Sequence, residues 1–246
     1  MNKIIALLTI TFPLISHALE TVDSNSIALP AAGGSGQVEA ALNGFTGNTT
    51  ENSLTTGGRI DYLANTTLMS VTGEFSKIRA DHQQVVNTGW ADAHYTDEFK
   101  HGLAAEAFLD YLQDDERFLA NRTQAAAGVR LTLDYEPEQR ALYLSLDGLH
   151  EWQSQAFNTQ DYWRGNAGIT YKRQISPQAH ILASLRYQPK FSDWNNYNIY
   201  DVLELGVDIN SALTLSAGLQ HEYDSTIPAG IKHNDMVYQT ALKLKF

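Results

Sequence analysis

Apolar and polar residues alternate along most of this chain. In its closing segment, Leu242, Leu244 and Phe246 fall on one face, whereas Lys243 and Lys245 fall on the other. A period of two residues indicates β-strands, because helices repeat every 3.6 residues. The same alternation predicts strands at about 37–45, 50–63, 67–77, 87–97, 102–112, 122–135, 141–152, 161–174, 179–190, 198–209, 213–224 and 236–246.

These segments predict an all-β fold, a transmembrane antiparallel up-and-down β-barrel of about 12 strands over residues 37–246. Strands of ~10 residues suit a bilayer, and an even number of strands places both ends of the barrel on the periplasmic side. Most connections after odd strands read as long and polar, and those after even strands as short. A soluble β-sandwich or a periplasmic lipocalin-like barrel is the alternative, and either would pack the apolar face inward.

The N-terminal segment has the features of a secretory signal peptide. Lys3 precedes an apolar run from Ile4 to Ile15, and Ser16-His17-Ala18 supplies small residues for cleavage after Ala18. An N-terminal anchor helix is the alternative, but the run is short for a bilayer of ~30 Å. We therefore expect a signal peptide over residues 1–18 and a flexible periplasmic segment over residues 19–36. The chain has no cysteine, which excludes a lipoprotein anchor and disulfides.

The inward face of the predicted strands carries charges of both signs. A mixed ladder inside a narrow barrel is expected to pair and to fill the bore with salt bridges. A strongly ion-selective channel would show one dominant sign at its constriction. The predicted lumen-facing charges are Arg59, Asp61, Glu74, Glu106, Arg122, Arg130, Arg164, Lys172, Arg186, Glu204, Asp208, Glu222 and Lys243.

Aromatic residues recur near the ends of the even-numbered predicted strands. Aromatic girdles mark the membrane interfaces of transmembrane barrels, although aromatic residues also favour strands in general. The spacing predicts a periplasmic girdle of Tyr62, Tyr95, Tyr135, Tyr171 and Phe246.

The outward face of the closing strand resembles the C-terminal assembly signal of outer-membrane barrels, which ends in an aromatic residue on the lipid face. This resemblance predicts a signal made of Tyr238, Leu242, Leu244 and Phe246.

Composition and motifs add little chemistry. The formal net charge of −11 argues against nucleic acid as a partner. No histidine pair has the spacing of a zinc site, and no G-x-S-x-G elbow appears. We therefore predict no catalytic residue, no metal ligand and no cofactor. His221 is expected to point outward, as a lipid hydrolase on the barrel surface would require, but no serine has a defined relation to it.

Three stretches together resemble a known family. They are Gly44-Phe45-Thr46-Gly47-Asn48-Thr49, the segment from Asn121 to Val129 with Ala126 in place of a glycine, and Ser225 to Gly230 followed by Asp235 and Lys245-Phe246. They are similar to the salt-induced outer-membrane proteins, the YdiY-like family of unknown function. The resemblance implies an outer-membrane barrel and supplies no enzymatic residues.

The sequence thus predicts a monomeric integral protein in the outer membrane of a Gram-negative bacterium. Its expected role is structural or in small-solute permeation, without catalysis. The expected partners are outer-membrane lipid, lipopolysaccharide and the outer-membrane barrel assembly machinery. An outer-membrane lipid hydrolase and a soluble periplasmic β-barrel binding protein are the alternatives.

Overall fold

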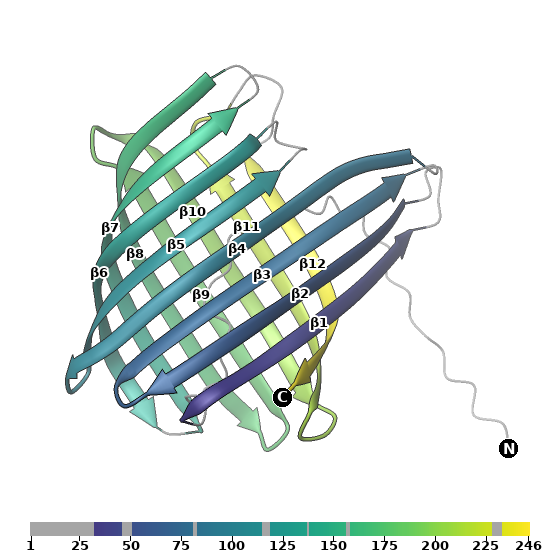
Figure 1. Ribbon diagram of the computed structural model, residues 1–246, viewed down its shortest axis with the longest axis vertical. Coiled ribbons are helices and arrows are strands. Elements are labelled where there is room, and N and C mark those ends of the chain that lie inside the picture. The colour runs from purple at the N-terminus through teal and green to yellow at the C-terminus, as the bar shows by residue number, and fades with distance from the viewer. Residues whose placement is uncertain are drawn as a thin grey trace, which may run out of the picture.

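The computed structural model describes residues 32–45, 51–80, 83–114, 119–136, 138–155, 158–227 and 233–246. These residues form a closed barrel of antiparallel strands, as the alternation predicts (Figure 1). In this part of the chain, no helix has both the length and the apolar character needed to span a membrane. The predicted signal peptide over residues 1–18, the Gly47-Asn48 turn and Pro228 to Gly230 lie outside the described residues.

Consecutive strands are neighbours around the whole barrel. The strands are β1 (Gly33–Phe45), β2 (Glu51–Ala64), β3 (Thr67–Ala80), β4 (Gln83–Lys100), β5 (Leu103–Asp114), β6 (Leu119–Glu136), β7 (Arg140–Gln155), β8 (Asn158–Ser176), β9 (Ala179–Lys190), β10 (Asp193–Asp208), β11 (Leu213–Asp224) and β12 (Asn234–Lys245).

The barrel closes where β1 pairs with β12. Ala40 lies opposite Leu242, and Gln37 lies opposite Lys245. At the end of this seam, the backbone amides of Gly36 and Phe246 each donate to the carbonyl oxygen of the other at 2.9 Å. Closure leaves no unpaired edge there. We call the rim at which Gly36 and Phe246 pair the near rim. The opposite rim is the far rim.

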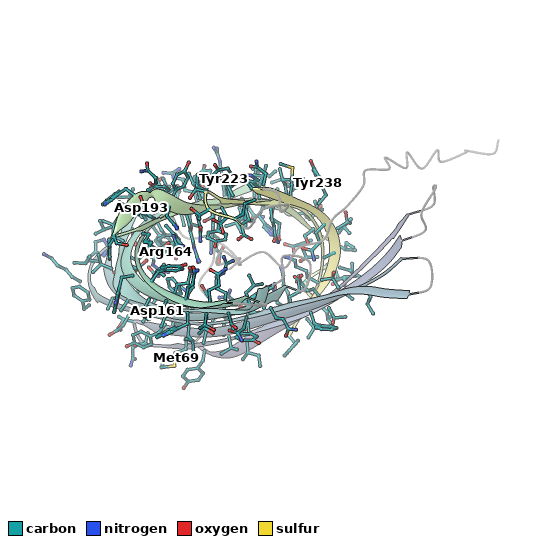
Figure 2. All side chains as sticks on the ribbon, turned by 90° about the horizontal axis from the view of Figure 1, so that it is seen from above. Met69, Asp161, Arg164, Asp193, Tyr223 and Tyr238 are labelled. Carbon is teal, nitrogen blue, oxygen red and sulfur yellow. The ribbon has the colours of Figure 1, made fainter. Side chains whose placement is uncertain are left out.

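The two faces of the wall differ sharply in polarity. Side chains outside the ring are largely apolar and exposed, and Ile60 and Val71 are 65% and 59% exposed. Figure 2, a view along the barrel, shows Arg164 inside a flattened ring, and Met69 and Tyr238 outside it. An apolar outside and a polar inside are the reverse of a soluble barrel. This inversion disfavours a soluble binding protein.

Several strand boundaries differ from the predicted ones. β1 begins at Gly33, inside the segment predicted to be flexible, because Gly34 and Gly36 pair in register with Tyr62 and Ile60. A run of glycine and serine is typical of a linker. Here it forms a strand, because these pairs are made by backbone groups and need no side chain.

The fourth predicted strand, which ends at residue 97, is too short. β4 continues to Lys100, and the turn falls at His101-Gly102, where Gly102 has a φ of 73° that favours glycine. Asp97 lies within the strand and accepts hydrogen bonds from the hydroxyls of Thr66 and Thr67.

The strands are also longer toward the far rim than the sequence predicts. β3 and β4, β7 and β8, and β9 and β10 each approach within two residues of one another in sequence, so these connections are not long loops. Beyond the lipid-facing band, residues with polar outward side chains still pair through their backbones. Apolar and polar residues no longer alternate there.

Candidate functional site

An ion pair crosses the bore toward the far rim. Arg122 on β6 places Nη2 3.1 Å from Oε1 of Glu222 on β11, on the opposite side of the ring. The two side chains are only 4% and 0% exposed. The Arg122 guanidinium also lies over the ring of Tyr200, 5.7 Å from its centroid. These contacts join opposite walls, and we call them the bridge.

A second polar network surrounds Arg164. Its guanidinium lies 3.2 Å from Glu151, and the Gln124 amide donates to the other oxygen of Glu151 at 2.7 Å. Gln124 also donates to Gln188 at 3.3 Å, and Gln188 donates to Asn166 at 3.2 Å. Buried groups that are bonded in this way hold side chains of β6, β7, β8 and β9 in fixed positions.

Two lysines of β12 pair with carboxylates on other strands. Lys243 Nζ lies 2.8 Å from Glu204 and 3.7 Å from Glu39, so it joins β12 to β10 and β1. Lys245 Nζ lies 3.0 Å from Asp208. Together with the bridge, these pairs keep side chains from distant strands packed inside the ring.

The structure places the residues of the predicted lumen-facing set on the inner face. Several are buried, among them both members of the 2.8 Å Arg59–Asp61 pair, and the rest are half-buried. The buried members are Arg59, Asp61, Glu106, Arg122, Arg164, Lys172, Glu222 and Lys243. The half-buried members are Glu74, Arg130, Arg186, Glu204 and Asp208.

Sequence reasoning missed several inner residues. Glu39, Asp92, His94, Asp147 and Glu151 also face the bore. His94 Nε2 lies 2.7 Å from Glu106, and Glu151 is fully buried. The signal that could have found them is the alternation itself. On the predicted strand 141–152, the leucines at even-numbered positions face outward, so the odd-numbered positions, which include Asp147 and Glu151, face inward.

The described residues line small cavities in the bore. The first, of about 40 Å³, is lined by β1 to β4 and β10 to β12 and includes Glu74 and Lys243. The second, of about 20 Å³, is lined by β4 to β9 and includes Arg130 and Arg186. We call them the first and second cavities. Side chains, and not an internal domain among the described residues, therefore restrict the bore.

Aromatic side chains mark both rims on the outer face. Near the near rim, Tyr62, Tyr95 and Phe246 are exposed and Tyr171 is half-buried, and the exposed Phe99 joins them. Tyr135 is exposed but does not fit the predicted girdle, because a register shift between Thr132 and Asp134 pairs it with Ala141, which lies on the inner face. The sequence missed Phe99 because it ended the fourth strand too early. The residues of the predicted assembly signal, Tyr238, Leu242, Leu244 and Phe246, are exposed on the outer face of the seam.

Toward the far rim, Tyr197 stacks between Tyr187 and Tyr223, with ring centroids 5.5 and 5.7 Å apart. His150 lies between Trp152 and Trp163. Two aromatic zones thus flank an apolar band, as at the two interfaces of a membrane.

His221 lies on the outer face of β11. Its Nδ1 is 2.7 Å from Asp201 Oδ2, and its Nε2 is 3.0 Å from Asn234 Oδ1. At Nε2, the hydrolase hypothesis requires a serine hydroxyl, but the neighbour is an amide. The geometry does not favour that hypothesis. Across the described residues, no cluster of three histidine or carboxylate side chains could hold a metal ion.

Solved structures with a similar fold are outer-membrane barrels. The COG4313 outer membrane channel from Pseudomonas putida F1 has a TM-score of 0.55 and 11% identity, covering 92% of this chain and 100% of that chain. The KdgM porin in complex with disordered oligogalacturonate has a TM-score of 0.48 and 11% identity, with 86% and 99% covered. The translocator domain of the autotransporter NalP from Neisseria meningitidis has a TM-score of 0.48 and 11% identity, with 91% and 90% covered. At these identities, the likeness shows the fold alone.

Sequence comparison identifies the family and nothing more specific. No curated protein matches the chain. Residues 38–246, which span the barrel, match the family model described as "Protein of unknown function, DUF481". The chain therefore belongs to the DUF481 family of proteins of unknown function.

Proposed function

We propose that this protein is an outer-membrane channel of low conductance for small polar solutes. One observation carries the proposal: the bore is lined by charged and amide side chains and contains cavities, while the outside of the same wall is apolar. Such a wall separates a lipid environment from a polar path. The bridge keeps that path narrow, because it joins opposite sides of the ring.

Reconstitution of the purified protein in planar bilayers tests this function. We expect small stepwise conductances in potassium chloride, well below those of wide, water-filled porins, because buried side chains from opposite strands meet inside the bore. Protein denatured before reconstitution is the control. A complete lack of conductance steps from folded barrels, across salts and voltages, would contradict the channel.

The location and partners form part of the same proposal. We place the barrel in the outer membrane of a Gram-negative bacterium as a monomer, in contact with lipopolysaccharide, after removal of a signal peptide. The resemblance to the salt-induced YdiY-like proteins supports this location. Tyr238, Leu242, Leu244 and Phe246 are proposed to present the seam to the barrel assembly machinery.

The substitution Phe246→Ala tests the assembly role. We expect it to lower the yield of folded barrel in cells more than it lowers the stability of barrels that do fold, because its ring is 73% exposed and contributes little burial. Heat-modifiable gel mobility measures yield, and urea unfolding in detergent measures stability. Phe246→Trp keeps an aromatic ring and serves as the control. Equal losses of yield and stability would show that Phe246 acts only in closure.

A further inference from the structure

The two end strands of the barrel pair with each other along only part of their length. β1 and β12 form ladder pairs from Gln37 opposite Lys245 to Ala40 opposite Leu242, and the backbones of Gly36 and Phe246 pair at the near rim. Among the described residues, no ladder pair joins the two strands beyond Ala40. We call the rest of this boundary, toward the far rim, the open seam.

Both strands continue past this point on their other sides. β1 pairs with β2 as far as Phe45, and β12 pairs with β11 from Asn234 onward. Figure 1 shows β1 and β12 separating toward the far rim, and in Figure 2 the purple-to-blue strands project beyond the ring. The wall is therefore continuous at the near rim and divided along the open seam.

The open seam begins inside the apolar band of the outer face. Residues 41–43 of β1 and 239–241 of β12 come directly after the last ladder pair. On β12, the outer residues on either side of this stretch, Tyr238 and Leu242, are both exposed. A strand edge without a ladder does not occur against lipid, and at this depth it is tolerated only where it lines a polar or water-filled space.

The first cavity lies directly behind the start of the open seam. It is lined by Glu39 of β1 and Lys243 of β12, which lie opposite each other in the paired part of the boundary. Gln239, which lines the same cavity, follows on β12 within the open seam. The cavity therefore supplies the polar space that these edges require, and the open seam lies between the cavity and the lipid.

The charged side chains that line this cavity are already partnered. Glu74 hydrogen-bonds to Glu39, which requires a proton on one of the two carboxyl groups, because ionised carboxylates only accept. A group that enters the cavity thus meets paired charges, which favours an uncharged group over an ion. The ion pairs are Lys243 with Glu204 and Glu39, and Arg59 with Asp61.

A hydroxyl group in the first cavity lacks a hydrogen-bond partner. Oγ1 of Thr72 is buried and makes no hydrogen bond to the other described residues. Buried polar groups are normally bonded, so this atom indicates a water molecule or a ligand group beside it. A cavity of about 40 Å³ suits a head the size of a hydroxyl group and not a sugar or a phosphate.

We propose that the first cavity and the open seam together bind a single-chain amphiphile with a small uncharged head, such as a long-chain alcohol. The head occupies the cavity beside Thr72, and the chain leaves through the open seam into the lipid. Such a ligand suits both surroundings, because its hydroxyl meets polar groups and its methylene groups meet the membrane. This site goes beyond the proposed channel and does not depend on its conductance.

Trp90 is a native reporter for the head of the ligand. It is buried and lines the first cavity, whereas Trp152, Trp163 and Trp194 are exposed. Phenylalanine at those three positions leaves Trp90 as the only tryptophan. The probe is 2-bromododecan-1-ol in phosphatidylcholine vesicles, because its bromine lies next to the hydroxyl and quenches tryptophan at close range. We expect the fluorescence of Trp90 to fall to a plateau as the probe is added.

A reporter in the second cavity is the matched control. In the same background, Trp90→Phe with Phe108→Trp moves the tryptophan to another buried position on the inner face. Both positions are separated from the surrounding lipid by the same thickness of wall, so quenching through the wall affects both. The control should show much weaker quenching, without a plateau. Equal quenching of the two reporters would overturn the site.

Thr72→Val tests the hydrogen bond to the head. Valine keeps the shape of threonine without the hydroxyl, so the probe concentration that gives half of the quenching of Trp90 should rise by roughly two- to tenfold, the effect of one neutral hydrogen bond. Thr170→Val removes a hydroxyl from the second cavity and should leave this concentration unchanged. The same concentration in Thr72→Val as in the parent protein contradicts the placement of the head.

Cysteine pairs measure the open seam itself, because the chain has no cysteine of its own. Continuation of the ladder would place residue 42 opposite residue 240, whereas Val38 and Leu244 are an existing pair. Leu42→Cys with Thr240→Cys should therefore need a longer bifunctional thiol reagent than Val38→Cys with Leu244→Cys. If the same shortest reagent joins both pairs, the strands meet there and the proposal fails.

The outcomes separate this site from the channel. Saturable quenching of Trp90 without potassium chloride conductance supports the amphiphile site and contradicts the channel. Conductance without saturable quenching supports the channel and overturns the amphiphile site. Heat-modifiable mobility confirms that each variant compared is a folded barrel.

Discussion

Replacing Arg122 and Glu222 together with alanine is expected to raise the single-channel conductance several-fold. The pair lies across the bore between β6 and β11, and both side chains are buried. Removing both truncates a polar obstruction across the bore. The double variant is the right test, because removing one partner of a buried ion pair costs about 3–5 kcal/mol by leaving the other charge uncompensated. Planar-bilayer recordings provide the measurement.

A rim pair supplies the control for this experiment. Arg140 and Asp134 form an exposed ion pair at 2.7 Å, with both side chains 46% exposed. Alanine at both positions removes an ion pair without opening the bore, so the conductance should stay at the wild-type value. A folded Arg122→Ala, Glu222→Ala variant with unchanged conductance would mean that another part of the bore restricts the flow.

The fold was largely predictable because two solvents act on the same wall. Lipid selects apolar residues at one set of positions and the bore selects polar residues at the other, so alternation continues through most of β6 and β11. Antiparallel neighbours with short turns then leave one simple topology, a closed ring. The alternation of inward and outward positions along each strand was enough to place Arg122, Arg164 and Glu222 on the inner face.

Pairing inside the bore was not predictable from the sequence. Arg122 and Glu222 lie 100 residues apart, and their contact depends on the diameter, tilt and flattening of the ring. The same is true of Lys243, which reaches both Glu39 and Glu204. Parity assigns a face to a side chain, but only closure decides which strands lie opposite each other.

The ends of β4 and β10 show a second limit. Both strands continue through polar residues beyond the predicted strand ends, such as Glu98 on β4 and Asn195 on β10. Outside the apolar band, a strand is held by its backbone ladder, and outward polar residues cost nothing in water. The remaining signal for the end of a strand is a residue that favours a turn, and Gly102 is that residue after β4.

Gly128 on β6 is the position where a side chain is expected to damage the fold most. A Cβ at Gly128 would overlap the carbonyl oxygen of Leu146 and atoms of Asp147 on β7. Part of this obstruction is backbone that is already fixed in the ladder, since Gly128 pairs with Asp147 and Val129 with Leu146. It cannot move aside as a flexible side chain would. Gly128→Ala is therefore expected to lower stability by about 1–3 kcal/mol, the usual cost of overpacking, and Gly128→Val by more.

Gly148 on β7 provides a matched control for Gly128, because nothing lies within 4 Å of a Cβ there. Gly148→Ala should leave stability unchanged or raise it by about 0.5–1 kcal/mol, since alanine restricts the unfolded chain more than glycine does. Heat-modifiable mobility and urea midpoints in detergent compare the two variants. If Gly128→Ala unfolds at the same midpoint as Gly148→Ala, then β6 and β7 can separate at little cost. In that case this part of the wall, which includes Arg122 and Glu151, is less rigid than its contacts indicate, and the bridge would be a weaker barrier in the bore.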